Sequence, residues 1–223
     1  MFGKRFPLFK LFGFQVKIEL SWLLIAALMV WSLATGEFPS QVGGLPGATY
    51  WWLGIAGALG LFGSIVIHEV SHSLVARRFG LPITGITLFI FGGVAEMDRE
   101  PPSPQSEFLM ALAGPVSSAL LALGFWLFSL WGGARESTGI VWPAVTALVG
   151  YLASINGSLA LFNILPAFPL DGGRVLRSIL WGWRDDLRWA TRLASRVGST
   201  FGYLLVGLGV LSLFLGRFSG GLW

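Results

Sequence analysis

The stretch that decides the fold of this chain is residues 50–79, YWWLGIAGALGLFGSIVIHEVSHSLVARRF. Its first 18 residues, Tyr50 to Ile67, carry no charge, and an uncharged apolar run of that length predicts a helix that crosses a bilayer. The run ends in an HExxH motif at His68, Glu69 and His72. Ionisable residues at membrane depth are costly and are functional candidates by default, so the motif predicts a metal site in a membrane protein.

The motif contains both histidines of the chain. Residues four apart project from one face of a helix, so His68 and His72 can offer two nitrogens to one zinc ion. Glu69, beside the first histidine, can act as a general base toward a metal-bound water. The pattern is short and also occurs where such residues only decorate a helix. That interpretation does not explain why all three residues end an uncharged membrane segment.

The composition is that of a membrane protein. Hydrophobic residues make up 54% of the chain and charged residues 12%, where a soluble domain carries about 25% charged residues. A chain of 223 residues then has room for about five or six spanning helices. Cysteine is absent, which excludes disulfides, thiolate ligands and a cysteine nucleophile. The predicted fold class is an all-α polytopic membrane protein.

Apolar runs place the spans along the chain. We expect clear spans at residues 20–35, 50–79, 107–131, 140–165 and 200–215. Pro166 and Pro169 must interrupt any helix because proline lacks an amide hydrogen, and residues 172–183 are expected to form a half-helix after them. An arginine-studded segment then precedes the last span. β-Branched and aromatic residues in 82–97, with a turn at Gly92-Gly93, predict a small membrane-associated β-hairpin after the second span.

The net charge of +4 comes from basic residues at span ends and in short loops, so nucleic-acid binding is not expected. A cytoplasmic N-terminus would place four Lys or Arg residues before the first span, three in 77–99 and six in 174–196 on the cytoplasmic side. Arg135 and Arg217 would then lie outside. This bias predicts a multi-pass protein of the lipid bilayer with a cytoplasmic N-terminus, and we expect a prokaryotic cell membrane.

The motif supplies only two of the ligands that a hydrolytic zinc site needs. Such a site has three protein ligands and one open position, and without a third histidine or a cysteine the third must be a carboxylate. Asp171 is the strongest candidate, because it follows a proline-broken apolar span, and such a break requires a buried or wet environment. An ordinary turn at Asp171-Gly172-Gly173 is the competing interpretation. Glu96, on the hairpin, is the second candidate ligand.

Asn163, near Asp171 in the sequence, has two interpretations. Asparagine often forms hydrogen bonds between packed helices in membranes. It can also donate a hydrogen bond to the oxyanion that develops during peptide hydrolysis. The local sequence does not separate these two roles.

Several motifs in order along the chain match a known family. They are HExxH at 68–72, FGGVA at 91–95, AGP at 113–115 and LFNILPAFPLDGGR at 161–174. With them the chain resembles, over almost its whole length, the site-2 protease family of intramembrane zinc metalloproteases. About 25 residues separate the second and third spans, which leaves no room for a PDZ domain and points to the compact archaeal and sporulation-type branch.

The resemblance implies a complete site with Zn²⁺ as cofactor. The zinc ligands it implies are His68, His72 and Asp171; the catalytic residues are Glu69, as base, and Asn163. It further implies that the hairpin holds a substrate strand, with substrate-binding residues at Phe91, Gly92, Gly93 and Val94. We expect residues 1–223 to form one transmembrane metalloprotease core. Relatives of this branch often continue with a further span and a CBS pair, so truncation before these and a natural end at Trp223 both stay open.

The predicted reaction is hydrolysis of a peptide bond in or near the transmembrane segment of a single-span membrane protein, as in regulated intramembrane proteolysis. An alternative is a non-catalytic membrane protein that binds zinc for structure or regulation; the intact Glu69 argues against it. A zinc transporter is a third interpretation. It would need several metal sites along a path, and the shortage of histidines and membrane-depth acids argues against that.

Overall fold

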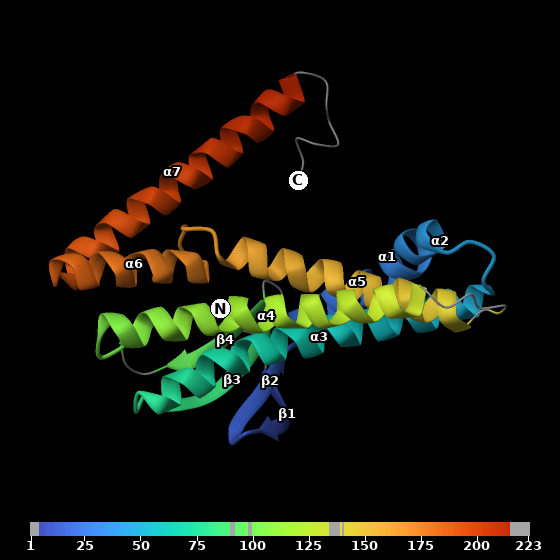
Figure 1. The fold of residues 1–223 in the computed structure, drawn as a ribbon, viewed down its shortest axis with the longest axis horizontal. Coiled ribbons are helices and arrows are strands. Elements are labelled where there is room, and N and C mark those ends of the chain that lie inside the picture. The colour runs from blue at the N-terminus through green and yellow to red at the C-terminus, as the bar shows by residue number, and fades with distance from the viewer. Residues whose placement is uncertain (1–4, 90–91, 98–99, 134–138, 140, 215–223) are drawn as a thin grey trace. The chain divides into compact units, whose positions relative to one another are not determined.

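The computed structural model describes residues 5–89, 92–97, 100–133, 139 and 141–214. In chain order the elements are β1 (Arg5–Leu11), β2 (Phe14–Glu19), α1 (Leu20–Ser32), a π-helical turn (Leu33–Glu37), α2 (Phe38–Gln41), α3 (Gly47–Arg78), β3 (Ile83–Phe89), β4 (Gly92–Met97), α4 (Pro104–Gly133), α5 (Val141–Asn163), α6 (Asp171–Arg184) and α7 (Leu187–Phe214) (Figure 1).

Five helical segments of the described chain are long and apolar enough to cross a membrane. They are Leu20–Gln41, Gly47–Arg78, Pro104–Gly132, Val141–Asn163 and Leu187–Ser212. This confirms the predicted fold class, an all-α polytopic membrane protein with a small β element. The chain forms two compact units, one of Met1–Glu100 with Ala113–Leu161 and the other of Pro101–Leu112 with Phe162–Trp223.

A four-stranded sheet belongs to the first unit, with strand order β1-β2-β3-β4 (Figure 1). The β1–β2 and β3–β4 pairs are antiparallel, whereas β2 and β3 are parallel, with Val16 opposite Ile86. The predicted hairpin after the second span is therefore present as β3–β4, but its turn was wrongly predicted at Gly92-Gly93: these glycines belong to β4 and pair with Phe89 and Leu88. The hairpin forms only half of the sheet. The other half, the N-terminal hairpin β1–β2, was not predicted.

The N-terminal hairpin forms because its second strand alternates apolar and polar side chains. In FQVKIE, the side chains of Phe14, Val16 and Ile18 are buried, as period-two alternation requires of a strand with one covered face. These side chains pack against Val66 and Val70 of α3. The sheet therefore fixes the helix that carries the HExxH motif.

A second apolar core of the first unit lies farther toward the N-terminal end of α3. Its buried members include Phe38 of α2, Leu53 of α3, and Tyr151 and Leu152 of α5. Phe38 and Tyr151 form an edge-on ring pair with centroids 5.8 Å apart, a preferred aromatic geometry. Both ends of the long helix α3 are thus held by packing, one against the sheet and the other against α5.

In the second unit, α6 and α7 form a helical hairpin (Figure 1). α6 confirms the predicted half-helix and ends at Arg184; the next residue, Asp185, has a left-handed φ of 52°. The last span was predicted to begin near Thr200, and this was wrong: α7 begins at Leu187. The arginines at 188, 192 and 196 are spaced by one helical turn, so the charged segment is itself the start of that helix.

The second unit contains an ion pair with a buried carboxylate. Glu107, in the first turn of α4, has no solvent-exposed surface. Its Oε1 accepts hydrogen bonds from Nε of Arg177, at 2.7 Å, and from Nη2 of the same guanidinium. Arg174 Nε is 4.0 Å from the same oxygen. The pair ties the N-terminal turn of α4 to α6.

Candidate metal centre

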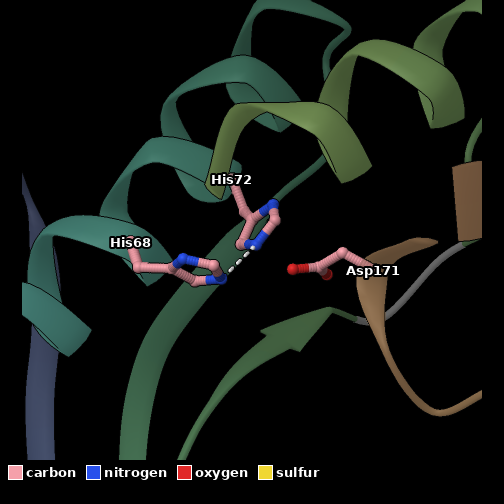
Figure 2. Close-up of side chains that lie close together, drawn as sticks. All are labelled: His68, His72 and Asp171. Atoms are coloured by element: carbon pink, nitrogen blue, oxygen red, sulfur yellow. Dashed lines mark hydrogen bonds between the residues drawn. The ribbon is translucent and has the colours of Figure 1, made fainter. Parts of the chain in front are cut away.

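The two histidines of the motif lie on the face of α3 that points away from the sheet. Val66 and Val70 cover the sheet, and His68 is two residues, or about 200°, from Val66 around the helix. Both imidazoles are buried, with exposed fractions of 4% for His68 and 7% for His72. Their Nε2 atoms are 3.2 Å apart and turned toward one another (Figure 2).

Helix α4 closes the histidine face with a glycine. A Cβ atom at Gly114 would lie 2.2 Å from Nε2 of His72 and 2.6 Å from Nε2 of His68. No side chain fits at either distance, so α4 can approach both nitrogens this closely only with a glycine at position 114. One turn further along α4, Ser118 Oγ lies 2.9 Å from Nδ1 of His68.

Glu69 points to the sheet side of α3 instead. A Cβ atom at Gly93 would lie 2.5 Å from Cγ and 3.0 Å from Oε1 of Glu69, so the carboxylate packs directly on the backbone of β4. The side chain is partly exposed. The predicted base thus lies between the histidine pair, one residue away in the chain, and the hairpin that was predicted to hold substrate.

Asp171 is the first residue of α6, directly after the proline-containing loop. The loop backbone folds tightly onto this helix start, because a Cβ at Gly172 would lie 2.2 Å from the carbonyl oxygen of Ile164, and one at Gly173 would lie 2.7 Å from the amide nitrogen of Phe168. Asp171-Gly172-Gly173 is therefore not an open turn but a packed helix start. Asn163 is the last residue of α5, and its side chain is partly buried.

The donor set fits a zinc ion. One donor atom from each of His68, His72 and Asp171 lies within 4.8 Å of those of the other two (Figure 2). A tetrahedral zinc that holds two nitrogens at about 2.0–2.1 Å separates them by about 3.3 Å, close to the 3.2 Å between the two Nε2 atoms. Two nitrogens and a carboxylate oxygen are a ligand set of hydrolytic zinc sites, in which the fourth position is open.

The other predicted residues are placed only in part. Gly92, Gly93 and Val94 belong to β4, whereas Phe91 and the side chains of Val94 and Glu96 lie outside the described residues. Glu96 therefore stays a second candidate. The roles of Gly114, Ser118 and Glu107 were not predicted. For the first two, the AGPVSS sequence puts positions 114 and 118 on one face of a helix, but it does not say what that face contacts.

Comparison with known proteins decides the family. The model of "Peptidase family M50" matches residues 56–141 and 134–206. The chain belongs to this family. The predicted likeness to site-2 proteases is confirmed by a solved structure, the site-2 protease from Methanocaldococcus jannaschii, which has 26% sequence identity and a TM-score of 0.56. That match covers 98% of this chain and 91% of the other.

Curated relatives extend beyond the matched part. A Mycobacterium tuberculosis protein named as zinc metalloprotease Rip3 is 39% identical over 97% of this chain and 54% of its own length. The zinc metalloprotease MJ0392 of M. jannaschii is 35% identical over 69% of this chain and 42% of its own length. The chain thus spans about half the length of these relatives.

Proposed function

We propose that this chain is an intramembrane zinc metalloprotease that hydrolyses a peptide bond in or near the transmembrane segment of a membrane-bound substrate. The observation that carries the proposal is the position of Glu69 against β4, in the same turn of α3 as two buried histidines. The Nε2 atoms of these histidines are 3.2 Å apart. Membership of family M50 and relatives named as zinc metalloproteases support it.

His68, His72 and Asp171 would hold the zinc ion. A bound zinc ion supplies a Lewis acid that makes a water molecule more acidic and polarises the peptide carbonyl. Glu69 accepts the proton from that water at its carboxylate and returns it to the leaving amine. Asn163 donates a hydrogen bond from its side-chain amide to the carbonyl oxygen as negative charge develops there.

The substrate would be bound as an extended strand on β4. A transmembrane helix buries its carbonyl groups in its own hydrogen bonds, so it must unwind locally before hydrolysis. β4 is a terminal strand of the described sheet, and a peptide can pair with such an edge through its main chain. Gly93 would then bring the peptide next to Glu69, with Phe91, Gly92 and Val94 as the other substrate-binding residues. Cleavage of a single-span regulator would constitute regulated intramembrane proteolysis.

The site would face the cytoplasm of a prokaryotic cell, and water would enter from that side. The support is the bias of basic residues. The parallel pairing of β2 with β3 supports it further, because it joins the segment before α1 to the segment after α3. Two of the basic regions that the count assigns to the cytoplasm would thus lie on one side of the membrane.

Proteolysis by purified protein in liposomes tests the proposal. Wild type and Glu69→Gln are loaded with zinc and given a single-span substrate, and both cleavage and bound zinc are measured. We expect Glu69→Gln to bind zinc as wild type does and to lose cleavage. Glu100→Gln, the same chemical change at an exposed position, is the matched control and should cleave normally. Undiminished cleavage by Glu69→Gln would contradict the role given to this residue.

A non-catalytic zinc protein gives a different result. In that case wild type and Glu69→Gln would both bind zinc, and neither would cleave a membrane-bound substrate. Zinc content measured beside cleavage therefore separates a wrong assignment of the base from a wrong assignment of the function.

A further inference from the structure

Ser118 makes a contact that the proposed reaction does not use. Its Oγ lies 2.9 Å from Nδ1 of His68, the ring nitrogen on the far side from the Nε2 that faces His72. Ser118 has no exposed surface, and His68 is 4% exposed. A hydrogen bond in such a place is shielded from competition by water.

We propose that Ser118 is a positioning residue for the metal centre: Ser118 holds His68 in the tautomer that carries its proton on Nδ1. The Nδ1–H donates to Ser118 Oγ, and the Nε2 lone pair is then directed away from Ser118, toward His72. A histidine ligand is generally oriented in this way, by a hydrogen bond to its second nitrogen. The inference rests on the proposed zinc site and adds to it a residue from another helix.

Two positions of α4 act together in this arrangement. Gly114 and Ser118 are one helical turn apart and so share a face. Gly114 leaves room for both Nε2 atoms, since a Cβ there would come within 2.6 Å of each. Ser118 fixes the rotation of the His68 ring from its other side. α4 therefore supplies both the space and the orientation, although it contributes no ligand of the predicted set.

The neighbouring serine provides a matched control. Ser117 Oγ donates to the carbonyl oxygen of Gly114, 2.7 Å away within α4, and no contact of its hydroxyl with either histidine is seen among the described residues. Ser117→Ala and Ser118→Ala remove the same atom from adjacent residues. A difference between these variants isolates the contact with His68 from general effects of losing a hydroxyl in this helix.

The test uses the fact that the chain has two histidines. ¹⁵N-histidine labelling gives signals from two imidazole rings, each with an Nδ1 and an Nε2, and a His72→Gln variant assigns them to their residues. In metal-free protein we expect His68 of wild type and of Ser117→Ala to be protonated on Nδ1. In Ser118→Ala we expect a mixture of tautomers. All samples carry Glu69→Gln, so the result does not depend on cleavage.

Zinc affinity, measured by competition with a chelator, is the second readout. We expect Ser118→Ala to bind zinc about 10–100-fold more weakly, the usual effect of losing a hydrogen bond to a metal ligand. Ser117→Ala should stay within twofold of wild type, and Ser118→Thr, which restores a hydroxyl, should recover most of the affinity. If Ser118→Ala does not fold, Ser118→Cys retains the size of the side chain with a weak hydrogen-bonding group and replaces it in both measurements.

Two outcomes would overturn the inference: an unchanged His68 tautomer in Ser118→Ala, or zinc affinities of the two alanine variants that agree within twofold. Neither outcome affects the proposed function, which the cleavage experiment with Glu69→Gln decides separately. Conversely, zinc binding without proteolysis would remove the function and leave the role of Ser118 in the metal centre intact.

Discussion

Glu107 and Arg177 form an ion pair between α4 and α6, with Nε of the guanidinium 2.7 Å from Oε1 of the buried carboxylate. Arg177 lies six residues after Asp171 on the same short helix. The pair therefore anchors the helix that begins with the predicted third ligand. A buried ion pair adds little net stability beside apolar residues of equal size, but removal of one partner leaves an uncompensated charge.

Arg177→Met should therefore destabilise the protein. We expect the free energy of unfolding to fall, but by less than the about 3–5 kcal/mol that a buried partner without any counter-charge costs, because Arg174 Nε stays 4.0 Å from the same oxygen. Unfolding in mixed detergent micelles measures the change. Arg188→Met, at an exposed position of α7, removes the same charge and should have little effect. Equal stability of the two variants would show that the Glu107 pair is not structural.

Gly114→Ala should abolish zinc binding in a folded protein. The added methyl group would come within 2.2 Å of His72 Nε2, so the imidazoles must move. Gly124→Ala, on the same helix, is the control, because a Cβ at Gly124 would meet no atom within 4 Å. Metal content and helical circular dichroism are measured for both. Normal zinc content in Gly114→Ala would show that α4 does not limit the space at the histidines.

Asp171→Asn should lower the zinc content well below one ion per chain, because a neutral amide is a weaker ligand for zinc than a carboxylate. Asp185→Asn makes the same change at the left-handed residue that follows α6, a conformation that asparagine tolerates. It should bind zinc normally. If Asp171→Asn also keeps its zinc, the carboxylate of Glu96 becomes the candidate to substitute next.

Asn163→Ala separates the two roles open to this residue. If Asn163 stabilises the oxyanion, kcat should fall by about 10²–10³-fold with zinc content and stability nearly unchanged. If it only packs between helices, stability should fall and kcat per folded molecule should persist. Steady-state cleavage of a fluorogenic transmembrane peptide and thermal unfolding, measured on the same preparation, give both quantities.

The spans could be predicted because a bilayer imposes a simple length and polarity requirement. The apolar runs at 50–79 and 107–131 correspond closely to α3 and α4. The start of α7 could not be found in this way, since Arg188, Arg192 and Arg196 fall below any hydropathy threshold while lying in the helix. Charged residues mark where a helix leaves the hydrocarbon layer of the membrane. They do not mark where its backbone hydrogen bonds begin or end.

Only those residues of the site could be predicted whose side-chain type alone indicates a metal ligand or a catalytic group. HExxH named His68 and His72, and the count of possible ligands led to Asp171. The contacts of Gly114 and Ser118 with the histidines depend on which helix faces α3, and no local pattern states that. The N-terminal hairpin is a different case: the alternation of Phe14, Val16 and Ile18 is itself a strand pattern, although no strand was predicted there.

The parallel pairing of β2 with β3 also bears on how the chain is assembled. Gln15 pairs with Gly85, 70 positions later, and parallel neighbours always need a long crossover. Here that crossover consists of two candidate membrane spans, α1 together with α2, and α3. If α3 stayed uninserted or crossed the wrong way, the two strands would be separated by the hydrocarbon layer, about 30 Å thick. The sheet can therefore close only when both helices cross the bilayer in the correct sense.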